Sequence, residues 1–170
     1  PRTLYAMRDQ GTVERLGRGM YRFADMSAMG NPDLTTVALK VPKGVICLIS
    51  ALSWHEMTSE IPHEIYLALP RGAETPRLAY PPLRIFWFQG QTFEEGVEEH
   101  DMDGIRVRIY SPEKTLADCF KYRNKIGIDV ALEALKLYRQ RKRLKADTLV
   151  HFARICRVEK VMRPYLEATL

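Results

Sequence analysis

The sequence lacks the cysteine pattern of disulfide-rich or zinc-binding proteins and the long apolar run of membrane-spanning ones. Its 170 residues include only three cysteines, Cys47, Cys119 and Cys156, which lie far apart among apolar neighbours. Such an odd, scattered set fits neither a disulfide framework nor a zinc site, and it predicts buried thiols in a reducing cytoplasm. No apolar run approaches the roughly 20 residues that cross a bilayer, so we expect no membrane partner.

Catalytic motifs are also missing. The chain contains no G-x-S-x-G, no P-loop and no G-x-G-x-x-G. His55-Glu56 begins like H-E-x-x-H, but the position of the second histidine is occupied by Ser59. Two zinc ligands therefore do not share one helical face there. We therefore expect no catalytic residue, no metal and no cofactor. An enzyme, such as a nucleotidyltransferase or nuclease relative, stays as the third hypothesis, after the two binding functions given below.

The remaining composition is that of a globular protein with a mild excess of positive charge. The chain is 46% hydrophobic and 28% charged, and its formal net charge is +5. A chain of this length buries enough surface for a hydrophobic core without disulfides or metal. The positive balance favours a polyanionic partner, and the places where the charge gathers are more informative than the total.

Arginine gathers in the first 25 residues. Residues 1–10 predict a helix that ends at Gly11, and residues 12–23 predict a hairpin whose turn contains Gly17 and Gly19. A helix followed by an arginine-bearing hairpin is the arrangement of the recognition helix and wing of a winged helix-turn-helix; an ordinary basic surface hairpin is the alternative. The residues expected to contact DNA are Arg2, Thr3, Tyr5 and Arg8 in the helix, and Arg15, Arg18 and Arg22 in the hairpin.

A break at Gly30-Asn31-Pro32 separates this unit from a longer one. Strands come first and helices afterwards, which is typical of an α+β domain. We therefore expect a partial winged helix over 1–25, followed by a mixed-sheet domain with C-terminal helices over 33–170. The expected elements are a helix over 34–41 capped by Asp33, a strand end and core helix over 45–57, strands over 64–70, 83–89 and 105–110, and helices over 111–127, 128–140, 146–156 and 158–168.

A second basic cluster stands at the end of the helix expected over 128–140. Its members are Lys136, Arg139, Arg141, Lys142, Arg143 and Lys145. Cations complement the dipole at a helix C-terminus, so a solvated helix end is one interpretation. A patch for nucleic acid or an acidic partner is the other. The acidic run over 93–104 predicts a solvated loop, with docking to a basic partner as the alternative.

Residues 111–127 predict a helix with a well-marked start. Ser111 suits the N-cap and Pro112 the first helical position. Lys114 and Asp118 stand four residues apart on the face that also carries the later lysines. We interpret them as a surface ion pair worth a few tenths of a kcal/mol, about 0.2–0.5 kcal/mol, and not as an acid/base couple.

Arg123 is the residue in this segment that does not fit the pattern. The 3.6-residue period places it in the apolar stripe around Cys119. A buried guanidinium must be paired and hydrogen-bonded, because its desolvation is otherwise costly. We therefore predict a buried Arg123 that is held by a carboxylate or a backbone carbonyl, from Asp129, Glu133 or the preceding sheet.

Three segments in the order expected of one family cover much of the chain. They are ERLGRGMYRF at 14–23, CLISALSWHEMTSEIP at 47–62 and SPEKTLADCFKYRNKIG at 111–127. They contain a G-x-Y at the end of the wing, an S-A-L helix and an S-x-E-[KR]-T-L-x-D helix start. With these features the chain resembles the AbiEi-type antitoxins, the transcriptional regulators of type IV toxin–antitoxin modules. In that family a winged-helix domain precedes a larger antitoxin domain.

The resemblance implies two activities. The winged helix would bind operator DNA upstream of its own operon and repress it, and the second domain would counteract a nucleotidyltransferase-like toxin in phage defence. A complete winged helix has two helices before the recognition helix, and these would precede Pro1. The alternative function is that of a truncated protein-interaction module, which docks a partner without binding DNA.

Overall fold

The computed structural model describes residues 13–17, 20–23 and 32–168. Strands β1 (Val13–Gly17) and β2 (Met20–Phe23) pair antiparallel, with Glu14 opposite Arg22 and Arg15 opposite Tyr21. The hairpin predicted from the sequence is therefore confirmed at the level of the backbone. The expected recognition helix and the turn between the two strands lie outside the described residues.

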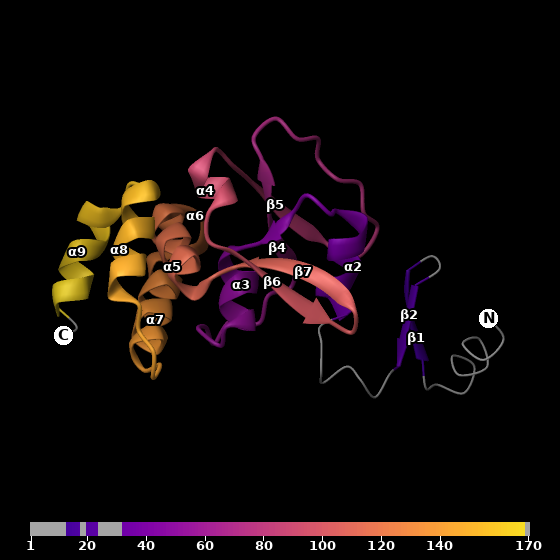
Figure 1. The fold of residues 1–170 in the computed structure, drawn as a ribbon, viewed down its shortest axis with the longest axis horizontal. Helices are drawn as coiled ribbons and strands as arrows, with labels where there is room; N and C mark the ends of the chain where they lie inside the picture. Colours follow the sequence, from indigo (N-terminus) through magenta and orange to yellow (C-terminus); the bar gives the residue numbers. More distant parts are fainter. Residues whose placement is uncertain (1–12, 18–19, 24–31, 169–170) are drawn as a thin grey trace.

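A five-stranded mixed sheet forms the centre of the larger unit (Figure 1). Its order is β5-β4-β3-β7-β6. Pairs β3–β7 and β4–β5 are parallel, whereas β3–β4 and β6–β7 are antiparallel. The strands are β3 (Val45–Ile46), β4 (Ile65–Pro70), β5 (Leu83–Phe88), β6 (Val97–Met102) and β7 (Ile105–Tyr110).

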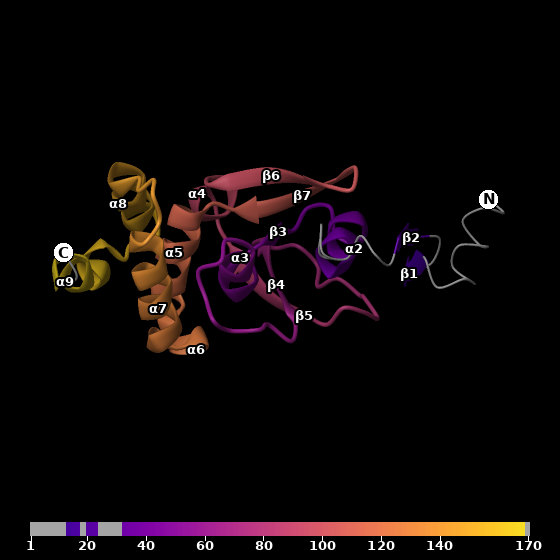
Figure 2. The same ribbon diagram turned by 90° about the horizontal axis from the view of Figure 1, so that it is seen from below.

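Eight helices accompany this sheet among the described residues. They are α2 (Pro32–Lys40), α3 (Leu48–Trp54), α4 (Gln91–Glu94), α5 (Pro112–Lys121), α6 (Arg123–Ile126), α7 (Ile128–Arg139), α8 (Ala146–Ile155) and α9 (Glu159–Ala168). Figures 1 and 2 show α5, α7, α8 and α9 gathered at one end of the sheet, on the C-terminal side. The predicted α+β class, with a mixed sheet followed by helices, is thus confirmed.

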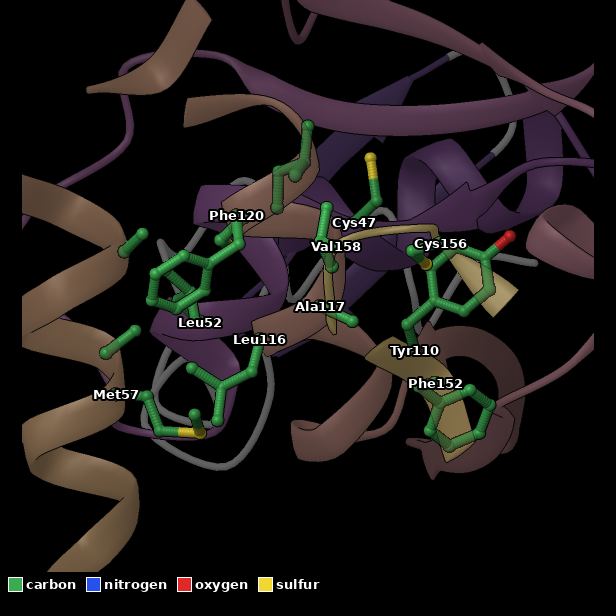
Figure 3. Close-up of a cluster of buried hydrophobic side chains, with 14 of the residues drawn as sticks. Cys47, Leu52, Met57, Tyr110, Leu116, Ala117, Phe120, Phe152, Cys156 and Val158 are labelled. Carbon is green, nitrogen blue, oxygen red and sulfur yellow. The ribbon is translucent and has the colours of Figure 1, made fainter. Parts of the chain in front are cut away.

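The sheet separates two hydrophobic clusters. Because side chains alternate along a strand, Val45 and Tyr110 enter one cluster, while their neighbours Ile46 and Ile109 enter the other. The larger cluster lies against α3, α5 and the helices that follow, and Figure 3 shows Phe120 of α5 within it. The smaller cluster includes apolar residues of α2. Helix α5 therefore lies within the larger core and not at its edge.

The sequence predicted a solvated loop over 93–104, and that prediction is wrong. Part of it forms α4, and Val97–Met102 forms the edge strand β6, which pairs with β7 along its whole length. Val97 and Met102 are the only apolar residues in this strand. The pairing is made by backbone groups, so an edge strand can form in a sequence with almost no alternating apolar pattern. A smaller difference is that Asp33 lies within the first turn of α2, which begins at Pro32.

Arg123 is not buried in the apolar stripe, so that prediction is wrong. Helix α5 ends at Lys121, and the separate short helix α6 begins at Arg123, so the 3.6-residue period does not continue to this residue. Arg123 is half-buried, and its guanidinium donates to the carbonyl of Phe120 at 2.8 Å. The expected backbone-carbonyl partner is confirmed, but neither Asp129 nor Glu133 provides it, and neither does the sheet.

Candidate functional site

Helix α5 begins as the sequence predicts, but its surroundings are different. The Ser111 hydroxyl accepts the backbone N–H of Lys114 at 3.2 Å, which caps the helix. Every residue from Pro112 to Phe120 is buried. The polar face of this helix was expected to be solvated. A helical period shows which side chains share a face, but it does not show whether other elements cover that face. Here other helices and the end of β7 cover it.

Lys114 and Asp118 form a buried ion pair, and the prediction of a surface pair is wrong. The Lys114 ammonium lies 2.9 and 2.7 Å from the two carboxylate oxygens, and the side chains are 0% and 1% exposed. The same ammonium lies 4.0 Å from the ring centroid of Tyr110 and 4.9 Å from that of Phe88. These rings add cation–π attraction to the pair. The two charges therefore depend on each other, since each alone would be buried without compensation.

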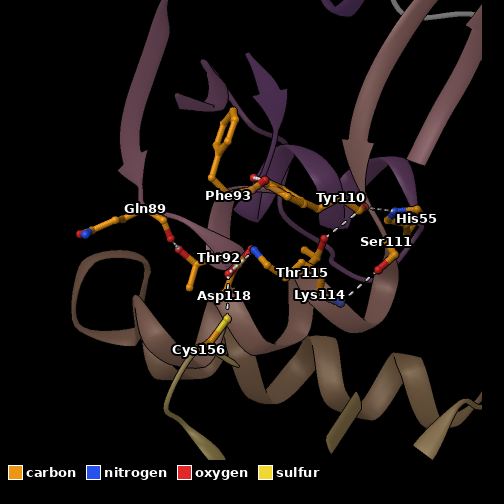
Figure 4. Close-up of polar contacts among 10 residues, drawn as sticks. All are labelled: His55, Gln89, Thr92, Phe93, Tyr110, Ser111, Lys114, Thr115, Asp118 and Cys156. Carbon is orange, nitrogen blue, oxygen red and sulfur yellow. Dashed lines mark hydrogen bonds and ion pairs between the residues drawn. The ribbon is translucent and has the colours of Figure 1, made fainter. Parts of the chain in front are cut away.

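The Cys156 thiol completes the surroundings of Asp118 (Figure 4), where its sulfur donates to a carboxylate oxygen at 3.4 Å. Burial raises the pKa of the Asp118 carboxyl, while the charge of Lys114 and the bonds from Lys114 and Cys156 oppose that effect. Burial also raises the pKa of Cys156 to about 12, so this residue is a protonated donor. All three cysteines are buried, as predicted. The cluster is enclosed and suits a structural role more than proton transfer.

His55 connects the end of α3 to the end of β7. Its Nε2 lies 2.7 Å from the carbonyl oxygen of Tyr110, so this nitrogen carries a proton that it donates. Burial lowers the pKa of the imidazole, against the opposing effects of that hydrogen bond and of Glu98 at 3.9 Å. The Nε2 of His100 lies 3.1 Å from the same carboxylate oxygen of Glu98. Within the described ranges, no group of three or more His, Cys, Asp or Glu side chains has the arrangement of a metal site.

The connection between α7 and α8 carries most of the second basic cluster, and it is held at both ends. The Arg141 guanidinium donates to the backbone carbonyl of His55 at 2.9 Å. The backbone N–H of Lys145 donates to the Tyr138 hydroxyl at 2.9 Å, and that hydroxyl donates to the buried carboxylate of Glu113 at 2.7 Å. Residues Arg141–Lys145, which we name the basic connection, are therefore positioned by the core next to α5.

The charges of this cluster divide into two groups. Lys136 and Arg139 stand on the last turn of α7, as predicted, whereas the other four follow the helix. Arg139 is half-buried and donates to the carbonyl of Leu166. The exposed side chains of Lys142, Arg143 and Lys145 make no hydrogen bond or ion pair with any residue that the structure describes. These three side chains are therefore accessible to an external anion.

The structure places few of the expected DNA contacts. Arg2, Thr3, Tyr5, Arg8 and Arg18 lie outside the described residues. Arg15 and Arg22 stand on the paired strands β1 and β2, where the description is limited to the backbone. The register brings the two strands together and places both arginines near the middle of the hairpin.

Sequence reasoning missed the two residues that hold the basic connection from inside. Tyr138 stands among the apolar residues of α7, and a tyrosine hydroxyl in such a position requires a polar partner. Glu113 stands in the first turn of α5, where a carboxylate suits the positive end of the helix dipole, but this residue is only 5% exposed and its carboxylate accepts from Tyr138. The tyrosine hydroxyl was a usable signal, but its partner is 25 residues away in the sequence.

No family model matches the chain, and no curated protein matches it. Among the described residues no helix combines the length and apolar character required to span a membrane.

Proposed function

We propose that the chain is a DNA-binding transcriptional repressor and antitoxin of a type IV toxin–antitoxin module, related to the AbiEi-type regulators that its sequence resembles. One observation carries most weight. A paired hairpin, β1–β2, precedes an α+β unit that has its own core and sheet. A wing followed by a larger domain is the order expected in that family.

The chemistry of the hairpin suits a phosphate backbone. Arg15 and Arg22 stand on the two strands, and Arg18 lies between the strands in the sequence. The planar guanidinium group can donate two parallel hydrogen bonds to phosphate oxygens, and it stays charged at every physiological pH. We propose that these arginines contact the operator upstream of the chain's own operon, with Arg2, Thr3, Tyr5 and Arg8 at the bases.

The basic connection supports a second contact in the larger unit. Lys142, Arg143 and Lys145 are exposed and have no side-chain partner among the described residues, and the connection is held by Arg141 and by Tyr138. A fixed cluster loses less conformational freedom on binding than a loose one. We propose that it adds contacts to nucleic acid. If it instead holds an acidic partner, the chain acts as a protein-interaction module.

The antitoxin activity is proposed to oppose a nucleotidyltransferase-like toxin encoded beside this chain. No direct contact between toxin and antitoxin is required. Co-expression of the two full-length genes tests this part, because the chain should restore growth that the toxin alone arrests. Growth arrest that persists in the presence of folded chain contradicts the antitoxin activity.

A gel-shift experiment on the native upstream region tests DNA binding with the full-length gene product. The wild type should retard this DNA, and replacing Arg15, Arg18 and Arg22 by alanine should remove most of the shift. Random DNA of equal length is the control for specificity. Growth rescue without any shift would identify the protein-interaction module as the correct alternative.

A further inference from the structure

A pocket of about 540 Å³ opens where three distant segments meet. The segments are the turn before α4 with the start of that helix, the last residue of α5, and the end of α8 with the connection that follows it. The volume is within the range of about 300–1,000 Å³ that is usual for small-molecule sites. The polar lining residues used below are Gln89, Gln91, Thr92, Lys121, Cys156 and Arg157.

Among the residues that the structure describes, the lining offers donors and positive charge but no carboxylate. Lys121 and Arg157 are both exposed, and neither forms an ion pair with a residue that the structure describes. The Oε1 atom of Gln89 already accepts from Arg71 at 2.7 Å, which leaves the N–H groups of that amide for another partner. Gln91 adds a further amide. A site with cations, amide donors and no acid is complementary to an anion.

The wall behind the pocket does not repel an anion. Cys156 lines the pocket, and its thiol donates to Asp118 in the core. The Asp118 charge is balanced by Lys114, which contacts both carboxylate oxygens. The ion pair is thus neutral as a unit, and Lys121 and Arg157 determine the sign of the local field.

The backbone of Arg157 makes a clean test possible. Arg157 has φ +59°, and the N–H of Val158 bonds to the carbonyl of Ala153 at 2.8 Å, which closes α8 with a Schellman motif. Glycine is the residue that suits this left-handed position best. Helix α3 ends in the same way at Glu56, also with φ +59°, and Glu56 does not line this pocket.

We propose that this pocket binds the phosphate group of a small phosphorylated molecule. The Arg157 guanidinium and the Lys121 ammonium bind the phosphate oxygens, and the amides of Gln89 and Gln91 donate to neighbouring hydroxyl oxygens. The hydroxyl of Thr92 bonds the backbone of Gln89 and shapes the turn. No aromatic residue lines the pocket, so its chemistry favours a sugar phosphate over a nucleobase. This inference does not depend on the proposed DNA binding.

Calorimetric titration of the full chain with ribose 5-phosphate is the test, with neutral ribose as the control ligand. The wild type should bind ribose 5-phosphate and inorganic phosphate, and it should not bind ribose. Lys121→Gln and Arg157→Gly should each weaken binding by about tenfold or more, because each removes a charge-assisted hydrogen bond.

Matched glycine variants separate binding from folding. Arg157→Gly and Glu56→Gly should both raise the melting temperature, because each relieves a left-handed residue. Only Arg157→Gly should lose the ligand, while Glu56→Gly should bind as the wild type does. Unchanged binding in Arg157→Gly would overturn the proposal, and so would equal binding of ribose. It would also be overturned if the pocket variants weakened duplex DNA binding while phosphate did not bind at all.

Discussion

Two regions of this molecule carry positive charge in opposite surroundings. Lys114 is 0% exposed and is enclosed by Asp118 and two aromatic rings. Lys142, Arg143 and Lys145 of the basic connection are exposed and have no side-chain partner within the described ranges. The first group is part of the core, and the second is available to a partner. The difference arises from how many elements pack around each segment.

The two regions are also connected. Glu113 is the neighbour of Lys114 in α5, and its carboxylate accepts from Tyr138, whose hydroxyl in turn accepts the backbone N–H of Lys145. The buried polar groups next to α5 therefore fix the position of the exposed charges. If the comparison is sound, changes in the buried group should alter stability, whereas changes in the exposed group should alter binding alone.

The largest effect is expected from Asp118→Asn. The change leaves the Lys114 ammonium buried without its counter-charge, which should destabilise the fold by about 3–5 kcal/mol. Urea unfolding measures this. The double variant Lys114→Met with Asp118→Leu removes both charges and should recover much of the stability. An unfolding midpoint for Asp118→Asn equal to that of the wild type would contradict the buried pair.

Tyr138→Phe should have the next largest effect. It leaves the buried carboxylate of Glu113 and the backbone of Lys145 without their shared partner, at a cost of about 1–3 kcal/mol. Trypsin should then cleave the basic connection faster than in the wild type. The control is Tyr122→Phe, since no hydrogen bond to the Tyr122 hydroxyl exists within the described residues. Cleavage at equal rates in all three proteins would show that the connection is not held by Tyr138.

His55 should make stability depend on pH. Burial lowers the pKa of His55 in the folded state below its usual 6.5, so the unfolded chain binds more protons in the window between the two values. The contribution of neutral His55 to stability is fully present above about pH 6.5. It falls as the pH drops toward the folded pKa, by at most about 1.4 kcal/mol per pH unit.

The variant His55→Gln isolates this dependence. Glutamine can still donate to the Tyr110 carbonyl, but it does not titrate. Urea midpoints measured from pH 7.5 to 5 should fall less steeply in this variant than in the wild type. His63→Gln at an exposed position is the control for the substitution itself. Identical profiles in wild type and His55→Gln would remove His55 as the cause.

The smallest effect on stability is expected from replacing Lys142, Arg143 and Lys145 together by alanine. Surface substitutions without partners change stability little, so the unfolding midpoint should stay where it is. DNA affinity at low salt should nevertheless fall, because the variant has three fewer cations. A clear decrease in stability would show that these side chains belong to the fold, and unchanged affinity would show that the patch is not a nucleic-acid site.

Much of this architecture could be predicted from local pattern. The alternation of Ile105–Tyr110 indicated a strand, and Ser111-Pro112 indicated a helix start, both at the positions observed. The strand β6 was not predicted, because its side chains are mostly charged and its pairing uses backbone groups. The burial of α5 was not predicted for another reason, since burial from several sides depends on elements that are distant in sequence.

For the candidate site too, local pattern predicted the residues, whereas their partners depended on the fold. The period that placed Arg123 in the apolar stripe was correct for a continuous helix, but α5 ends at Lys121. Glu133, a predicted partner of Arg123, instead accepts the backbone N–H of Ser59 at 2.8 Å and its hydroxyl at 2.7 Å. Local spacing identifies which residue types stand where, but partners 74 residues away come only from the fold.

The measurement that tests the central proposal most directly is the salt dependence of binding to the native upstream DNA. For the wild type, log K should fall linearly with log salt concentration. In the Arg15, Arg18 and Arg22 alanine variant, the slope should be shallower by about one unit for each arginine that binds a phosphate in the wild type. Equal slopes for the two proteins, or binding that does not respond to salt, would contradict a phosphate-contacting wing.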